Sequence, residues 1–409
     1  MKILILTNNY YPLKNANELC VYNIIQQIEN ASFYIVSLSE KEETIKIDNS
    51  TIFCLDKHRL KRKISNIYLQ ILCELPFRIL SLIYRPVLKR RIVNEYIKKS
   101  DEIIKQFHPD AIIAVVNPIN SLEAAYILKK KYPKIKFVIY DIDSLSNCNF
   151  GILENFPIIK NLYLKSAKKY ENKVFSIADL IIHFNCHKSH FNEDFYKKFL
   201  HKTLFLGVPV LNLFKSFKEN TNKDFIYSGR FYGQLRDPKI LINIFEKVFE
   251  RTNSKLHIYT NGDYVINIPK ALNVKHSDCA KNILVHNYVE QKELNKITDK
   301  IGFLVSLGNS YTDMFPSKII SYVGSLKPII HIYQTPDDPV IEFLKKYPDA
   351  LLINSKDSLE INSNKIIEFV NSERPVIEPE FIKEIYKENL PEYSANEIMS
   401  FLNMNKNSR

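Results

Sequence analysis

The chain has 409 residues, of which 45% are hydrophobic and 25% are charged, an ordinary globular balance that excludes a largely disordered or fibrous protein. This length predicts two or three domains, each large enough to bury its own core. There are only 8 glycines, and their positions exclude both the GxGxxG dinucleotide fingerprint and the GxxxxGK[ST] P-loop.

The positive charge of the chain is local. The formal net charge is +12, and the segment from Lys57 to Lys99 alone holds twelve basic residues against two acids. Such a surplus indicates phosphate-bearing partners or an anionic membrane. The six cysteines form no CxxC pair and no apolar leader opens the chain, so we expect a cytoplasmic protein, peripheral on the inner membrane face.

In the first half of the chain, short apolar runs predict buried parallel strands at 2–7, 33–38, 111–116, 136–140 and 180–184. Helical apolar spacing separates them, most clearly at 119–131 and 163–177. Alternating strands and helices predict a doubly wound, Rossmann-like domain, which we place at 1–214.

A second alternation predicts strands at 224–228, 255–259, 283–288, 302–307, 328–332 and 350–353. We place this second α/β domain at 215–378, after a polar linker around Pro209 and Lys218. The segment 379–409 is helical and is expected to pack back toward the first domain. The predicted fold class is therefore α/β, with two Rossmann-like domains facing a cleft.

The insert at 58–107 is basic and amphipathic. Its apolar face carries Ile67, Ile71, Leu75, Ile79, Leu82 and Ile83. A membrane span is excluded because Glu74, Pro76 and Arg78 interrupt the apolar run. Two interpretations stay open: the insert binds an anionic membrane surface, or its helices pack on the N-terminal sheet and its basic residues are merely solvated.

The loop after the strand at 224–228 carries two arginines, Arg230 and Arg236, within seven residues. Guanidinium forks at the carboxyl end of a strand suit a diphosphate, because ligands of such sheets bind at that edge. The alternative is that both arginines are surface residues, and Asp237-Pro238 is simply a good helix start.

A second anchor for an anion follows the strand at 302–307. The loop from Asn309 enters a predicted helix at Pro316, which places Ser317 and Lys318 in its first turn. A lysine at the electropositive start of a helix is unfavourable unless an anion sits opposite. A solvated lysine without a partner is the alternative.

Together these motifs resemble a known family. The succession of strand, Gly229-Arg230, helix, Pro316-Ser-Lys-Ile319 and Lys327-Pro-Ile-Ile330 looks like the nucleotide-sugar half of a GT-B glycosyltransferase, family 4 being the nearest match. Residues 2–12 resemble the first strand and acceptor loop of that family. The resemblance implies a donor site made of Arg230, Arg236, Asn309, Asp313, Ser317, Lys318 and Ser321. It also implies that 1–214 is the acceptor-binding domain, with acceptor binding by Asn8, Tyr11 and Asn17, and that 215–378 is the nucleotide-sugar-binding domain.

The sequence departs from the family at two places. Family 4 members commonly have two glutamates eight positions apart, where this chain has Asp313 and Ser321. Asp313 can keep the first role, but Ser321 cannot accept two ribose hydrogen bonds as a carboxylate can. The usual glycine pair of the acceptor loop is replaced by Asn15-Ala-Asn-Glu18.

Glycosyl transfer requires stabilisation of the departing diphosphate and a route for the proton of the acceptor hydroxyl. Arg230 and Lys318 serve the first need as catalytic residues. Asp143, just after the strand at 136–140, is our candidate for the second. It would be the general base of an inverting enzyme, or would orient the acceptor in a retaining one, which the resemblance favours. An Asp at a strand end also caps turns and helices.

His183, Cys186, His187 and His190 invite comparison with a metal site, but the chain offers no second ligand cluster with zinc spacing. We expect no metal, no cofactor beyond the nucleotide-sugar co-substrate, and no nucleic-acid partner. The predicted function is transfer of a sugar to a glycan or lipid-linked acceptor in bacterial surface polysaccharide or glycoconjugate synthesis. The alternatives are a nucleotide-sugar epimerase of the same fold and a non-catalytic binding partner of another glycosyltransferase.

Overall fold

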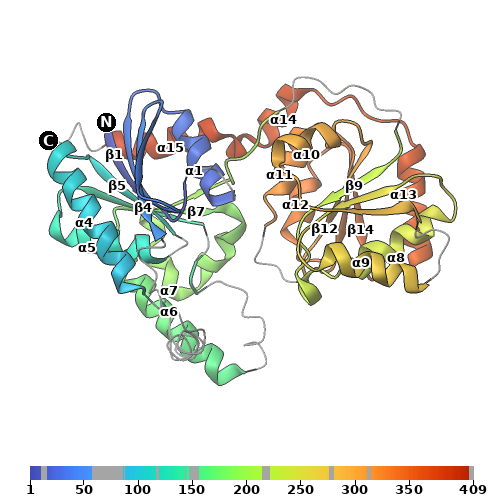
Figure 1. Cartoon of the computed structure of the whole chain (residues 1–409), viewed down its shortest axis with the longest axis horizontal. Coiled ribbons are helices and arrows are strands. Elements are labelled where there is room, and N and C mark those ends of the chain that lie inside the picture. Colours follow the sequence, from blue (N-terminus) through green and yellow to red (C-terminus); the bar gives the residue numbers. More distant parts are fainter. Residues whose placement is uncertain are drawn as a thin grey trace. The chain divides into compact units, whose positions relative to one another are not determined.

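The computed structural model describes residues 1–10, 16–57, 86, 88–116, 119–142, 144–146, 156–213, 222–275, 281–310 and 315–404. The chain divides into two compact units, an N-terminal unit of Met1–Val210 with Glu388–Arg409 and a C-terminal unit of Leu211–Lys387. Each unit holds its own mostly parallel sheet (Figure 1), which confirms the predicted class of two Rossmann-like α/β domains. The boundaries expected after 214 and 378 compare with divisions after Val210 and Lys387.

Among the described residues of the N-terminal unit, eight strands form one sheet in the order β3-β4-β2-β1-β5-β6-β7-β8. The strands are β1 (Lys2–Leu6), β2 (Ser32–Ser39), β3 (Glu43–Ile47), β4 (Ser50–Asp56), β5 (Ala111–Val116), β6 (Lys136–Asp141), β7 (Leu180–Phe184) and β8 (Thr203–Leu206). All described pairs are parallel except β3 with β4. The apolar runs form central strands because a parallel sheet is buried on both faces.

Helices cover both faces of this sheet. They are α1 (Ala16–Gln26), α4 (Arg90–Phe107), α5 (Ile119–Lys131), α6 (Pro157–Ile177), the short α7 (Asp194–Lys197) and α15 (Pro391–Met404). Alternate strand residues such as Leu4, Ile112 and Phe137 face a core built with α4, α5 and α6. The intervening strand residues, such as Ile3, Ile5 and Ile113, face α1 and α15. These two helices pack against each other. This period of two is what places each strand's side chains on opposite faces.

Three strands, β3, β4 and β8, were not predicted from the sequence. In β3 every second residue is exposed, and this short edge strand pairs antiparallel with β4 through a tight turn at Asp48, whose φ is 48°. In β8 the first three residues are only half-buried. Neither β3 nor β8 shows the continuous apolar run that marks a buried parallel strand, so the sequence pattern did not indicate them.

The basic insert is described only in part. Residues 58–85 and 87, which include the apolar face predicted from Ile67 to Ile83, lie outside the described residues. The described remainder forms α4, whose Val93, Tyr96 and Ile103 are buried in the core of the N-terminal unit. The Tyr96 hydroxyl donates to the Thr7 carbonyl at 2.5 Å. For α4, therefore, the packing interpretation is confirmed.

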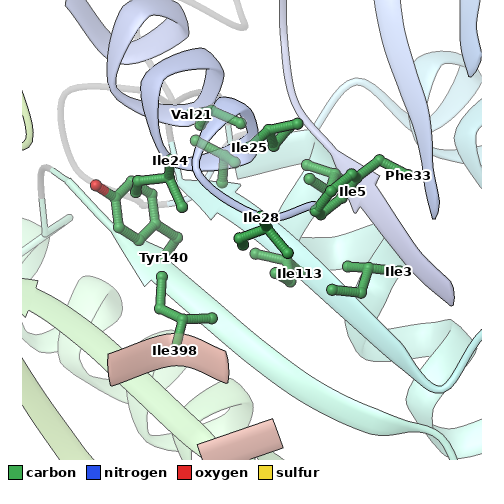
Figure 2. A pocket seen from close by; sticks show the side chains of 11 residues that line it. Ile3, Ile5, Val21, Ile24, Ile25, Ile28, Phe33, Ile113, Tyr140 and Ile398 are labelled. Carbon is green, nitrogen blue, oxygen red and sulfur yellow. The ribbon is translucent and has the colours of Figure 1, made fainter. Parts of the chain in front are cut away.

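The C-terminal helix α15 contributes to the N-terminal unit. Lys136 of β6 donates to the Leu402 carbonyl at 2.7 Å, and Ile398 faces the sheet together with α1. Between them lies an apolar cavity of about 30 Å³, whose wall includes Ile5, Ile24 and Tyr140 (Figure 2). A void this small and apolar is an ordinary packing imperfection.

In the described part of the C-terminal unit, six strands follow the order β11-β10-β9-β12-β13-β14, and each described pair is parallel. The strands are β9 (Phe225–Ser228), β10 (Leu256–Tyr259), β11 (Ile283–His286), β12 (Phe303–Leu307), β13 (Ile329–Tyr333) and β14 (Ala350–Asn354). The helices are α8 (Pro238–Phe249), α9 (Tyr264–Lys275), α10 (Gln291–Thr298), α11 (Lys318–Gly324), α12 (Pro339–Leu344), α13 (Leu359–Asn371) and α14 (Pro379–Ile385).

The starts of two helices in this unit bear on the site. Helix α8 begins as the sequence indicates, with the Asp237 carboxylate accepting from the Lys239 N–H at 2.9 Å and Pro238 in the first turn. Helix α11 begins at Lys318 rather than at Pro316, and Ser317 is the residue that precedes it. Lys318 is thus the first residue of its helix.

Candidate functional site

The centre of the C-terminal sheet is a topological switch point. The chain runs from β9 outward through β10 and β11, then returns to the other side of β9 to form β12, β13 and β14. The carboxyl ends of β9 and β12, the two strands at this switch point, are the usual ligand position in such sheets. Arg230 follows β9 and Asn309 follows β12.

Arg236 ties these two loops together. Its Nε and Nη2 donate to the Asn309 side-chain oxygen at 3.1 and 2.7 Å, and its Nη1 donates to the Arg230 carbonyl at 3.3 Å. Asn309 is buried beside Gly308, where a Cβ would come within 2.1 Å of an Asp338 carboxylate oxygen. The glycine thus permits the close approach of this loop to Asp338 and to the end of β13.

Lys318 reaches the end of β9 from helix α11. Its ammonium donates to the Ser228 hydroxyl at 2.6 Å, and the Tyr322 hydroxyl lies 3.3 Å from the same oxygen. Withdrawal from water lowers the pKa of Lys318 to about 8. A cation that has lost water without gaining a carboxylate is favourably placed to receive an anionic ligand.

Arg230 turns toward β10. With the Asn261 amide oriented so that its oxygen faces the guanidinium, Arg230 donates to it from Nε at 2.9 Å and from Nη2 at 3.2 Å. The two side chains line an open pocket of about 480 Å³ together with Asp263, Tyr264 and Asn267. The turn at Gly262, whose φ is 68°, shapes the far wall of this pocket.

The predicted donor residues thus surround the carboxyl end of β9 in two groups. Arg230 with Asn261 lies on the β10 side, while Lys318 with Ser228, and Arg236 with Asn309, lie on the β12 side. Ser317 and Ser321 are half-buried at and within α11, and Asp313 lies outside the described residues. The sequence analysis gave no site role to Ser228, Asn261 or Tyr322, although Tyr322 ends the Pro-Ser-Lys-Ile-x-x-Tyr motif.

The residues predicted for the acceptor side belong to the N-terminal unit. Asn8 follows β1, is half-buried, and accepts at its carbonyl from the Leu38 N–H at 2.5 Å. Asn17 lies half-buried in the first turn of α1. Tyr11 and Asp143 lie outside the described residues, so their predicted roles stay predictions.

Next to Asp143 in the chain, the structure shows a buried triangle that the sequence analysis missed. The Ser144 hydroxyl lies 2.8 Å from the Asp141 carboxylate and 2.7 Å from His183 Nε2, and that nitrogen is 3.2 Å from the same carboxylate. His183 Nδ1 accepts from the Phe184 N–H, so Nε2 carries the ring proton. Since Nε2 cannot then take the Ser144 proton, the triangle is not a nucleophile with its base.

A second buried set lies beside this triangle. Glu171 of α6 accepts from the Ser146 N–H at 3.1 Å, from the Ser146 hydroxyl at 2.6 Å, and from the Tyr196 hydroxyl. Burial, helped by the neighbouring Asp141 charge, raises the pKa of Glu171 to about 7. A sequence signal existed: Glu171 falls on the apolar face of α6 with Tyr163, Ala167 and Val174.

Among the described residues, no group of three or more His, Cys, Asp or Glu side chains is arranged to hold a metal ion. None of the described helices is both long enough and apolar enough to span a membrane.

The sequence matches no known family profile and no curated protein. Solved structures do match. WaaB, a lipopolysaccharide outer core galactosyltransferase, has a TM-score of 0.54 and 13% identity over 98% of this chain and 99% of its own. HepE of Anabaena, solved in complex with UDP and glucose, has a TM-score of 0.57 and 12% identity. The match covers 100% of this chain and 99% of HepE. A structure described as a UDP-N-acetylglucosamine 2-epimerase of Listeria monocytogenes has a TM-score of 0.54 and 13% identity. The match covers 100% of this chain and 97% of the epimerase.

These likenesses extend over whole chains at low identity, so they establish the fold. The chain has the GT-B glycosyltransferase fold, as the resemblance of its motifs predicted. Its placement in family 4 stays a prediction.

Proposed function

We propose that the protein is a glycosyltransferase that moves a sugar from a nucleotide-diphosphate donor to a glycan or lipid-linked acceptor. The observation that carries the proposal is the set of cations around the carboxyl end of β9. Lys318 and Arg236 reach it from the β12 side and Arg230 from the β10 side. Three positive side chains at a switch point suit a diphosphate in both charge and position.

The chemistry follows from these charges. The bond between the sugar's anomeric carbon and the diphosphate oxygen breaks, a bond to the acceptor oxygen forms, and negative charge builds on the departing diphosphate. Cations already in place stabilise that charge without reorganisation. The acceptor proton passes to Asp143 or to the leaving phosphate, and the family resemblance favours the second route, with retention of configuration.

The acceptor belongs, in this proposal, to bacterial surface polysaccharide or glycoconjugate synthesis at the inner membrane face. Support comes from the basic insert and from the structural likeness to WaaB, which is described as acting on lipopolysaccharide outer core. The donor is a nucleotide-diphosphate sugar, and HepE, of the same fold, binds UDP.

The test measures donor binding by calorimetry with UDP, GDP and CMP sugars, followed by transfer assays. Lys318→Ala and Arg230→Ala should each weaken binding of the accepted donor about tenfold or more, because each removes a charged hydrogen bond. Lys239→Ala is the matched control, since Lys239 is an exposed residue of α8 near the same loop. Unaltered donor affinity in both site variants would refute the proposal.

A second candidate is a nucleotide-sugar epimerase, favoured by the likeness to the Listeria epimerase. An epimerase consumes its nucleotide sugar without an acceptor, whereas a transferase releases nucleoside diphosphate only when an acceptor is present. Mixing the bound sugar nucleotide with protein alone, and following its stereochemistry by NMR, separates the two.

A further inference from the structure

The start of helix α6 presents apolar side chains to solvent. Phe156, which precedes the helix, is 50% exposed, Ile158 is 77% exposed and Leu162 is 49% exposed. In Figure 1 these first turns of α6 extend away from the sheet of the N-terminal unit. Farther along, the helix buries Tyr163, Ala167 and Val174 in the core, so its exposed large apolar side chains lie at its beginning.

The exposed face of α6 changes from apolar to basic along its length. Ile158, Leu162, Lys165 and Lys169 recur at helical spacing and are all exposed, so they share one face. No acid occurs between Phe156 and Tyr170. A face with apolar side chains at one end and lysines at the other is the pattern of a helix that inserts its apolar end among lipid acyl chains.

The charges beside α6 are also positive. At the start of α4 the exposed residues Lys89, Arg90 and Arg91 add three cations, and the charge of Arg90 acts on Tyr170, on the buried side of α6. The acids near α6 are already engaged. Glu193 pairs with Lys168 at 2.5 Å and the buried Glu123 with Lys173 at 3.2 Å, while Glu171 lies inside the core.

We infer that this surface, made of Phe156, Ile158, Leu162, Lys165 and Lys169, docks on an anionic lipid bilayer. The apolar side chains enter the headgroup boundary, and the lysines with the start of α4 pair with lipid phosphates. A partner protein with a plain apolar groove would not require the flanking cations. The inference rests on the proposed function only in that a lipid-linked acceptor lies at such a surface.

The experiment is flotation of the full-length protein with vesicles of phosphatidylcholine alone or mixed with phosphatidylglycerol. The wild type should float with the mixed vesicles only. Leu162→Glu should reduce the floated fraction about tenfold, because it removes an apolar side chain from the headgroup boundary and adds charge repulsion. Lys165→Gln and Lys169→Gln should each weaken partitioning about fivefold. Ile361→Glu is the matched control: Ile361 is 48% exposed on α13, so its loss should leave flotation unchanged.

The inference is wrong if the wild type floats equally on both vesicles or on neither, or if Leu162→Glu floats like the wild type. It is also wrong if the wild type sediments as a dimer that Leu162→Glu dissociates, because the face then binds a second copy. Donor affinity is measured on the same variants. A protein that floats but binds no nucleotide sugar refutes the proposed function and keeps the docking surface. A protein that binds a nucleotide sugar but does not float refutes the docking surface and keeps the proposed function.

Discussion

The two units place polar groups at the same edge of their sheets, yet the groups differ in kind. At the carboxyl end of β9 in the C-terminal unit they are cations, partly open to solvent, that hold neighbouring loops together. At the carboxyl ends of β6 and β7 in the N-terminal unit they are acids, hydroxyls and a histidine. These are buried and bonded to one another.

The difference separates groups that receive a ligand from groups that hold a loop. The ammonium of Lys318 is withdrawn from water and has no carboxylate of the described residues beside it. An anionic ligand would stabilise its charge. Glu171 instead satisfies Ser146 and Tyr196, so its bonds anchor the segment that follows Asp143. Substitutions of the cations at the carboxyl end of β9 should therefore change donor binding. Substitutions of the buried groups around Glu171 should change stability.

The largest effect is expected from Glu171→Ala. It leaves the Ser146 hydroxyl, the Ser146 N–H and the Tyr196 hydroxyl without their buried acceptor, so the unfolding free energy of the N-terminal unit should fall by about 4 kcal/mol. Chemical denaturation followed by tyrosine fluorescence measures the change. Glu193→Ala, which removes a half-exposed ion pair with Lys168, should cost under about 1 kcal/mol. Equal losses in the two variants would contradict the comparison.

Next comes the pH dependence of the same unit. The pKa of Glu171 is raised from 4.5 to about 7, so the folded state binds its proton more tightly than the unfolded state does. Its contribution to stability is thus complete below pH 4.5 and is lost as the pH rises through about 7, a change of about 3 kcal/mol. Glu171→Gln, which keeps a neutral side chain, should flatten the profile. A wild-type profile that already lacks this fall would show that the carboxylate is charged in the fold.

The sequence predicted most of the sheet framework because buried parallel strands leave an apolar run. The strands β5 and β7 and the helix α5 have the predicted bounds. The edge strand β3 alternates exposed and half-buried residues and relies on its pairing with β4, a tertiary contact that no local run announces.

For the site, sequence reasoning found the cations and Asn309, but not Ser228 or Asn261, the partners of Lys318 and Arg230. Arg230, Arg236 and Lys318 could be found because they are cations in segments that follow predicted strands. Their positions in the sequence therefore place them at the edge of the sheet where ligands bind. Ser228 is an unremarkable last residue of a strand, and its contact with Lys318 spans ninety positions. Glu171 meets Ser146 across twenty-five positions, so only its place on the apolar face of α6 hinted at burial.

A smaller effect should follow from Arg236→Met. This change keeps the length of the side chain but removes the bonds to Asn309 and to the Arg230 carbonyl. Donor affinity should fall about tenfold, from the lost charge and from looser loops. Calorimetry with the accepted nucleotide sugar measures it. Asn309→Ala separates the causes: it should weaken binding less than Arg236→Met, since the guanidinium remains. The same loss in both variants would assign Arg236 a purely structural part.

The smallest effect concerns the pH dependence of donor binding. In the folded protein the pKa of Lys318 is lowered from 10.5 to about 8, so the free protein begins to lose the ammonium charge above about pH 8. Because the diphosphate pairs with the charged form, the donor Kd should be constant below about pH 8. Above it the Kd should rise by up to about tenfold per pH unit. Lys318→Arg keeps its charge throughout and should remove the upward slope, even where its affinity is weaker. A wild-type Kd that is flat across this range would mean that the donor does not pair with Lys318, and the cations on the β12 side of β9 would then stabilise the loops alone.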